Sequence, residues 1–103
     1  MIAFSVFYPY KKDSHFDMDY YRNEHLGIIK RHFGDTCKGI LVVKGNHKEG
    51  KEPNFSCICH LFFNTEEEFQ GIMKKVNSEL MADVKNYTDI EPFTEINEVS
   101  MQE

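Results

Sequence analysis

Strand-like and helix-like hydrophobic patterns follow one another in a definite order along the 103 residues, and few folds accommodate that order. Side chains alternate between two faces over Ile2–Tyr10 and Phe55–Phe63, and both segments are rich in β-branched or aromatic residues, which predicts two β-strands. Shorter apolar runs over Lys38–Gly45 and Phe93–Val99 predict two more strands. The glycine- and charge-rich segment Asn46–Asn54 predicts the loop between the second and third strands.

Two segments between these strands carry the signals of amphipathic helices. Asp17 can cap the start of a helix that continues to Phe33, and Gly34 ends it. Thr65 and Glu68 form a capping box at the start of the second helix. The apolar stripe of the first helix contains Met18, Tyr21, His25, Ile28, Ile29, His32 and Phe33, and that of the second contains Phe69, Ile72, Met73, Val76, Leu80, Met81 and Val84.

The predicted order is strand, helix, strand, strand, helix, strand, which is typical of the ferredoxin-like, or split βαβ, α+β fold. In this fold the four strands form one antiparallel sheet. Two right-handed crossovers would place both helices on the same face of that sheet. A chain of 103 residues has room for one domain, so residues 1–103 are expected to form a single one.

The predicted strands pose a problem for a single copy, because two helices cover only one sheet face. Phe7 lies opposite Phe4 in the first strand. In the third strand, Ile58 and Phe62 lie opposite Leu61, so both faces carry bulky apolar groups. A large exposed apolar patch usually marks an interface. We therefore expect a twofold homodimer with sheet packed on sheet; the alternative is that the strand boundaries differ and one face is more polar.

Composition argues against several classes of protein. The chain has 12 Lys and Arg against 17 Asp and Glu, and this net charge of −5 disfavours nucleic acids and anionic membrane surfaces as partners. No apolar run approaches the roughly 20 residues of a membrane helix. The first residues have neither the basic start nor the small-residue cleavage site of a signal peptide. Three cysteines are an odd number, which favours a reducing cytoplasm over a disulfide framework.

No motif predicts a bound cofactor or metal ion. Cys57 and Cys59 share one face of a strand while His60 falls on the other, so these residues do not form a zinc site. The two cysteines are interpreted as small buried hydrophobic residues. No glycine-rich phosphate loop follows a strand, and the chain has no serine nucleophile elbow.

His25 is the leading candidate for chemistry. It lies on the apolar stripe that faces the sheet, and a histidine can act as acid or base near neutral pH; the alternative is a core histidine bonded to a carbonyl or a tyrosine. Tyr8, at the end of the first strand, can donate to a developing oxyanion or simply pack. Tyr21 either contacts a ligand or packs on Phe16 as a hydrophobic staple, and Asp17 is first of all a helix cap.

Two stretches of the chain resemble the EthD family. The first consists of Phe7-Tyr8-Pro9, Phe16-Asp17-Met18-Asp19-Tyr20-Tyr21 and His25-Leu26. The second runs from Met81 to Pro92 and is followed by Glu98-Val99. Together they span nearly the whole chain. The family is named for its association with bacterial degradation of ethyl tert-butyl ether and belongs to the dimeric α+β barrel superfamily.

The sequence departs from the family pattern at one position in the first helix. Gly27 stands two residues after the helix histidine, where the family often has proline. A glycine there is expected to loosen the helix around His25, since glycine costs about 1 kcal/mol relative to alanine in a helix. In the second stretch Tyr87 matches the family signature, and Thr88 and Asp89 are expected to tie down a loop through short side-chain turns.

The resemblance implies a dimeric α+β barrel that acts on small molecules. Members are often labelled reductases or oxidoreductases, and relatives resemble muconolactone isomerases and small cofactor-independent monooxygenases. We expect a cytoplasmic homodimer that binds and transforms a small, mostly apolar organic molecule, with His25 and Tyr8 as catalytic residues. Tyr21, Phe4 and Ile28 are expected to contact the ligand in a cavity between helices and sheet. The alternatives are a non-catalytic binding module and an auxiliary subunit of an oxygenase system.

Overall fold

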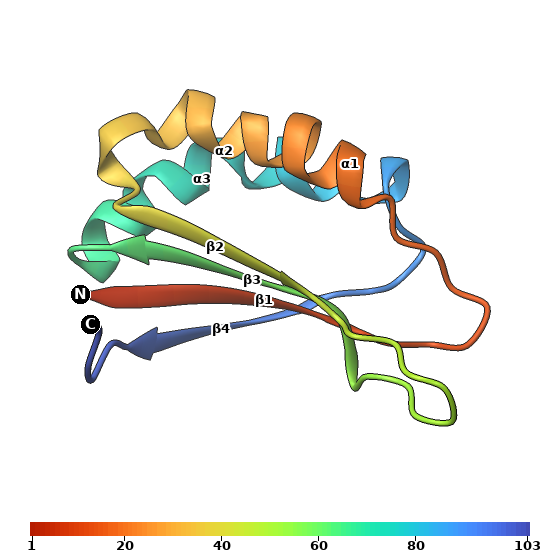
Figure 1. The fold of residues 1–103 in the computed structure, drawn as a ribbon. Coiled ribbons are helices and arrows are strands. Elements are labelled where there is room, and N and C mark those ends of the chain that lie inside the picture. The colour runs from red at the N-terminus through yellow and green to blue at the C-terminus, as the bar shows by residue number, and fades with distance from the viewer.

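A computed structural model describes residues 1–103 and shows the predicted order of strands and helices (Figure 1). The third strand has the predicted bounds. The first and fourth strands are each one residue shorter than predicted, and the second is two residues shorter. The elements are β1 (Ile2–Pro9), α1 (Met18–Tyr20), the π-helical turn η1 (Tyr21–His25), α2 (Leu26–Phe33), the 3₁₀ turn η2 (Gly34–Thr36), β2 (Gly39–Lys44), β3 (Phe55–Phe63), α3 (Glu66–Asp83), the 3₁₀ turn η3 (Val84–Asn86) and β4 (Phe93–Glu98).

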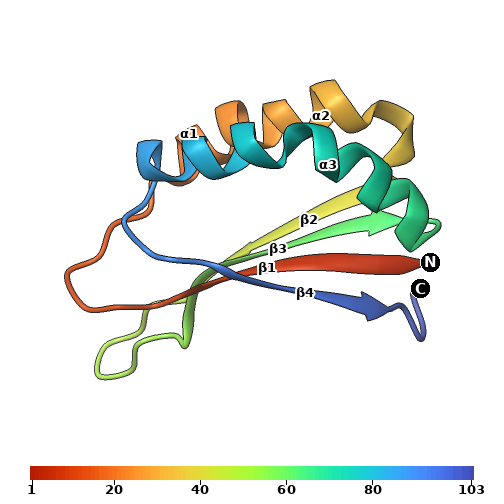
Figure 2. The ribbon, with the colours of Figure 1, turned by 180° about the vertical axis from the view of Figure 1, so that it is seen from behind.

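The four strands form one antiparallel sheet in the order β2-β3-β1-β4. Both helical segments lie on the same side of this sheet, and no part of the chain covers the other side (Figures 1 and 2). This is the ferredoxin-like α+β fold that the order of the patterns predicts. No helix in the structure is long and apolar enough to span a membrane.

The predicted helix caps are present. The Asp17 carboxylate accepts the backbone N–H of Tyr20 at 3.0 Å, and the Thr65 hydroxyl accepts that of Glu68 at 3.2 Å. Gly34 ends α2 with φ of +50°, in the left-handed region that favours glycine. These local signals fix where the helices begin and end, and so fix which side chains face the sheet.

The first helix differs from the prediction, because it is not one continuous α-helix. In η1 the backbone N–H of Leu26 donates to the carbonyl of Tyr21, a π-helical bond that spans five residues instead of four. This turn brings the rings of Tyr21 and His25 into a stack, with 5.4 Å between their centroids, and buries both. Such π-helical turns occur often at functional sites.

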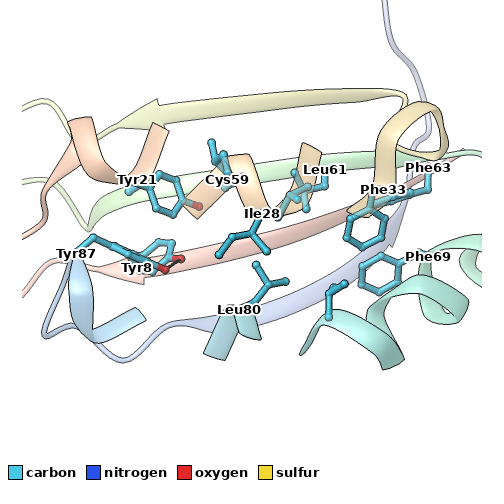
Figure 3. Packing of buried hydrophobic residues seen from close by; sticks show 14 of the residues in the cluster. Tyr8, Tyr21, Ile28, Phe33, Cys59, Leu61, Phe63, Phe69, Leu80 and Tyr87 are labelled. Atoms are coloured by element: carbon cyan, nitrogen blue, oxygen red, sulfur yellow. Dashed lines mark hydrogen bonds between the residues drawn. The ribbon is translucent and has the colours of Figure 1, made fainter. Parts of the chain in front are cut away.

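The core lies between the sheet and the helices (Figure 3). Phe63 of β3 packs against Phe33 of α2 and Phe69 of α3, with 5.1 Å between the centroids in each pair. Cys57 and Cys59 are free thiols buried on the helix-facing side of β3, as predicted for small hydrophobic residues. The buried apolar cluster consists of Tyr8, Tyr21, Leu26, Ile28, Ile29, Phe33, Cys57, Cys59, Leu61, Phe63, Phe69, Val76, Leu80, Tyr87 and Ile90.

The opposite sheet face is uncovered, and it carries apolar side chains around a polar strip that contains Ser5, His60 and Glu95. Leu41, Val43 and Phe93 are exposed on it, and Phe7 stacks on Phe93 with 5.0 Å between the ring centroids. We name this surface, formed by the outward side chains of all four strands, the open face. It carries the bulky side chains that the alternation in the first and third strands predicts.

Candidate functional site: a histidine–tyrosine network at an apolar cavity

A cavity of about 90 Å³ lies between the sheet and the helices, and twelve of its sixteen lining residues are hydrophobic. No Lys, Arg, Asp or Glu lines it. The lining includes four residues that the sequence nominates: Phe4, Tyr8, Tyr21 and His25. The other lining residues are Val6, Ile29, Cys59, Leu61, Met73, Asn77, Leu80, Met81, Val84, Tyr87, Pro92 and Thr94.

The cavity continues into an open groove between α3 and β4. The groove measures about 630 Å³, and six residues line both spaces. Phe4, Met73 and Asn77 are three of them, and the others are Met81, Pro92 and Thr94. A cavity of about 150 Å³ is known to hold a benzene ring, so a ligand of that size or larger would extend into this groove.

The Nδ1 side of the His25 ring is hydrogen-bonded to a carboxylate. The hydrogen bond between His25 Nδ1 and Asp83 Oδ2 is 2.8 Å long, and both side chains are nearly buried. Asp83 Oδ1 accepts two further hydrogen bonds, from the Tyr20 hydroxyl at 2.7 Å and from the Asn86 amide at 2.9 Å. The carboxylate therefore has three hydrogen-bond partners: Tyr20 and His25 in the first helical segment, and Asn86 just after α3.

The other nitrogen of His25 faces two tyrosines. The Tyr87 hydroxyl lies 3.4 Å from His25 Nε2, which is long for a hydrogen bond, and 2.7 Å from the Tyr8 hydroxyl. Figure 3 shows the oxygen atoms of Tyr8 and Tyr87 close together at one end of the core. Asp83, His25, Tyr87 and Tyr8 thus form a continuous hydrogen-bonded network that ends at the cavity.

Burial and hydrogen bonding act in opposite directions on the charged pair. Burial lowers the pKa of His25 below its ordinary 6.5, although the hydrogen bond and the charge of Asp83 favour the imidazolium. For Asp83, partial burial disfavours the charged form, but hydrogen bonds from Asn86, Tyr20 and His25 outweigh it and lower its pKa. Near neutral pH the pair therefore consists of a neutral imidazole and an ionised carboxylate.

The other polar groups at the cavity are neutral at ordinary pH. Burial raises the pKa of Tyr8 to about 12, even though hydrogen bonding to Tyr87 and Tyr21 opposes it. Burial also raises the pKa values of Tyr21 and Tyr87. It raises the pKa of Cys59 to about 11, so this thiol is not a nucleophile at neutral pH. His25 is thus the one cavity group whose proton exchanges readily near neutrality.

The segment after α3 carries Tyr87 and is pinned to the start of the first helix. The Asp17 backbone N–H donates to the Tyr87 carbonyl at 2.8 Å. The Thr88 hydroxyl donates to the His15 carbonyl at 2.6 Å and accepts the Ile90 N–H at 3.1 Å. Asp89 accepts the His15 N–H at 3.0 Å. Thr88 thus makes the short side-chain turn expected of it, whereas Asp89 ties down the segment through a long-range hydrogen bond with His15 instead of a turn.

Four of the five predicted site residues line the cavity, and one does not. Phe4, Tyr8, Tyr21 and His25 line the cavity, but Ile28 does not. Ile28 is buried in the core, and Ile29 lines the cavity instead, because successive helical residues point about 100° apart. Tyr21 also packs on Phe16, with 5.1 Å between the ring centroids, as the staple prediction requires.

Sequence reasoning missed the partner of His25. Asp83 is a polar residue at the end of an amphipathic helix, and nothing in its spacing connects it with a histidine 58 positions earlier. The signal was present only in the resemblance, whose second stretch includes both Asp83 and Tyr87. No group of three or more His, Cys, Asp or Glu side chains is arranged to hold a metal ion.

Comparisons with known proteins agree with this fold. A crystal structure of an EthD-like protein from Ralstonia eutropha JMP134 is 33% identical and superposes with a TM-score of 0.90, covering 99% of this chain and 94% of that one. An ethyl tert-butyl ether D (EthD) family protein from Bacillus halodurans C-125 is 15% identical, with a TM-score of 0.60 and coverage of 92% and 98%. Among curated proteins, none matches the chain.

A more distant structure, described as a dimeric ferredoxin-like protein from an uncultured marine organism, shares the fold. It is 10% identical, with a TM-score of 0.59 and coverage of 99% of this chain and 97% of that chain. The EthD domain matches residues 12–91, which include His25, Asp83 and Tyr87. The chain therefore belongs to the EthD domain family.

Proposed function

We propose that this protein binds a small, mostly apolar organic molecule in the cavity and transforms it by proton transfer. His25 would move the proton, and Tyr8 would orient or polarise the ligand. The observation that carries the proposal is the placement of His25 between an ionised carboxylate on Nδ1 and the cavity tyrosines on Nε2. This arrangement is typical of a histidine that acts as general acid or base.

The apolar lining supports a neutral ligand, since a charged one would lose its hydration without a counter-charge. Isomerisation and dehydration require the removal or delivery of a proton, and deprotonation also prepares an electron-rich substrate for oxidation, so all three are compatible with His25. For an oxidation, the reacting oxidant would come from outside the chain. We propose that the protein acts in the cytoplasm.

A second candidate is a non-catalytic module that carries or sequesters such a molecule, alone or within an oxygenase system. The observation that favours it is the small size of the cavity, about 90 Å³. Most ligand sites are several times larger. The two candidates differ in one respect: a carrier would bind a ligand and release it unchanged.

We also propose that the protein is a twofold homodimer in which the open faces of two copies pack together. Phe7, Phe93, Leu41 and Val43 contribute apolar surface to this face, and nothing in the chain covers it. A second copy presents the same apolar surface, as a twofold interface requires. The site itself lies on the opposite side of the sheet, so each copy would hold its own cavity.

The function is tested with His25→Gln and a matched control, His32→Gln, in the adjoining helix α2. His32 is partly exposed and pairs with Glu79, away from the cavity. A set of small phenols and lactones is screened for binding by NMR and for conversion by mass spectrometry. We expect the wild type and His32→Gln to convert a ligand, while His25→Gln loses at least about a hundredfold in rate. Turnover that survives His25→Gln would refute the catalytic role, and binding without any product would favour the carrier.

The dimer is tested by sedimentation equilibrium of the wild type and of Phe7→Asp. We expect the wild type to sediment as a dimer, and the variant as a folded monomer, because a carboxylate would be buried between the two sheets. Met101→Asp, at an exposed terminal position, is the control and should remain dimeric. A monomeric wild type would refute the dimer.

A further inference from the structure

The charged end of the network determines which group donates and which accepts in each of its hydrogen bonds. The Asp83 carboxylate receives hydrogen bonds from Tyr20, Asn86 and His25. An ionised carboxylate only accepts, so the Nδ1 of His25 must be the nitrogen that carries the proton. The neutral imidazole then has its lone pair on Nε2, which is the nitrogen that faces Tyr87.

This tautomer decides the direction of the next two hydrogen bonds. In the hydrogen bond between Tyr87 and His25 Nε2 the tyrosine hydroxyl is the donor, because that nitrogen has no proton to give. The Tyr87 oxygen then accepts from Tyr8, which lies 2.7 Å away. Every proton of the network therefore points toward Asp83. At the cavity end, Tyr8 donates its proton to Tyr87, so its oxygen can only accept hydrogen bonds. One lone pair of this oxygen serves the hydrogen bond with Tyr21, and the other is left for a ligand.

We propose that the ligand of this cavity is a neutral molecule with a hydroxyl on an sp² carbon, a phenol or an enol, which donates a hydrogen bond to Tyr8. In this scheme Asp83 is a positioning residue that fixes the tautomer of His25, and Tyr87 relays the proton between Tyr8 and His25. The inference rests on the proposed function and specifies the chemical class of its ligand.

The proton transfer balances without any further reactant. The O–H bond of the ligand breaks and its proton passes to Tyr8, while the proton of Tyr8 passes to Tyr87 and that of Tyr87 passes to His25 Nε2. No net change occurs in either tyrosine. The products are a ligand oxyanion and an imidazolium, whose positive charge is stabilised by the carboxylate of Asp83 at 2.8 Å. The hydrogen bond between Tyr87 and His25, 3.4 Å long in the structure, would shorten when the ligand binds.

Acidity and charge favour phenols and enols over other small molecules. A phenol has a pKa near 10, which makes it one of the more acidic neutral molecules that carry a hydroxyl group, so it gives up its proton to the relay most readily. An aliphatic alcohol is far less acidic. A carboxylate would enter as an anion, and no Lys or Arg lines the cavity to receive it. A ketone or ether offers only acceptor atoms and would face the lone pairs of Tyr8.

The first test compares ligands of nearly the same shape in NMR titrations of the wild-type protein. Phenol can donate a hydrogen bond, whereas anisole, its methyl ether, cannot. We expect phenol to bind about tenfold more tightly than anisole, as one such hydrogen bond implies, and benzoate to bind no better than anisole. In Tyr87→Phe, Tyr8 becomes free to donate, and the preference for phenol should disappear.

Equal affinity for phenol and anisole would overturn the inference while leaving the proposed binding site intact. If neither ligand perturbs the resonances of the cavity, both the inference and the proposed function are refuted. An unchanged preference for phenol in Tyr87→Phe would also overturn the inference. The direction of the hydrogen bonds between Tyr8, Tyr87 and His25 would then not be the cause of that preference.

The second test needs no ligand and reads the tautomer directly. Long-range ¹H–¹⁵N spectra distinguish a protonated from an unprotonated ring nitrogen, and above its pKa His25 should show a proton on Nδ1. In Asp83→Asn the amide can donate to Nδ1, so the Nε2 tautomer should become populated. Asp89→Asn, at an exposed carboxylate near His15, is the control and should leave His25 unchanged. A proton on Nε2 in the wild type would overturn the inference.

Discussion

Replacing Tyr87 with phenylalanine tests the network through the stability of the fold. The substitution keeps the ring, which packs with centroids 4.6 Å from His25 and 5.0 Å from Tyr21, so it opens no large cavity. It removes one oxygen atom that contacts both Tyr8 and His25. Any change in the free energy of unfolding is therefore assigned to these two hydrogen bonds.

The magnitude follows from what each substitution leaves behind. Tyr8→Phe removes one hydrogen bond, while the Tyr87 hydroxyl keeps His25 as a partner, so the loss should be about 1 kcal/mol. Tyr87→Phe removes both bonds and leaves the buried Tyr8 hydroxyl without this partner, so the loss should be about 2 kcal/mol. For a chain of this length, 2 kcal/mol corresponds to a decrease in Tm of roughly 10 °C.

The double variant isolates the bond between the two hydroxyls. Because that bond is lost in each single variant, the double variant should lose about 2 kcal/mol, which is about 1 kcal/mol less than the sum of the single losses. Urea unfolding at one fixed protein concentration measures all four proteins, since association of copies would add to stability. Strictly additive losses, or a smaller loss for Tyr87→Phe than for Tyr8→Phe, would refute the network.

Three further predictions concern pH and helix stability. The pKa of His25 is lowered in the folded state, so the unfolded chain binds the proton more readily. The free energy of unfolding should therefore fall as the pH decreases from about 6.5 to the folded pKa. Urea unfolding of His25→Gln should lack this dependence on pH. Gly27→Ala should stabilise α2 by about 0.5–1 kcal/mol, because no atom lies within 4 Å of the added Cβ, and a lower Tm would contradict this. Thr65→Ala should cost about 1 kcal/mol through loss of the cap on α3, whereas Thr65→Asp should retain stability in the same thermal scan.

The fold could be predicted from the sequence because its signals are local. Alternating side chains predict the strands, the caps at Asp17 and Thr65 mark the helix starts, and Gly34 ends the first helix. The π-helical turn at Tyr21–His25 could not be predicted, because it leaves the apolar stripe of the helix intact. Its effect on the site is nevertheless direct, since it stacks the two rings at the cavity.

The candidate site was predicted only in part. His25 and Tyr8 stand out because a histidine on an apolar stripe and a tyrosine at a strand end are recognisable patterns. Asp83 is not, because its hydrogen bond with His25 joins two helices that meet only in the folded chain. Ile28 was nominated in place of Ile29 because both lie on the apolar stripe, and spacing alone does not say which one borders the cavity.

The titration of His25 by NMR tests the central claim most directly. Its ring resonances, assigned with His25→Gln, are followed against pH in the free protein and with phenol added. The account predicts a pKa below the ordinary 6.5 in the free protein, because burial outweighs the hydrogen bond with Asp83, and a change in the titration when phenol binds. A His25 that titrates at the ordinary value and is indifferent to phenol would place it outside a working site and contradict the account.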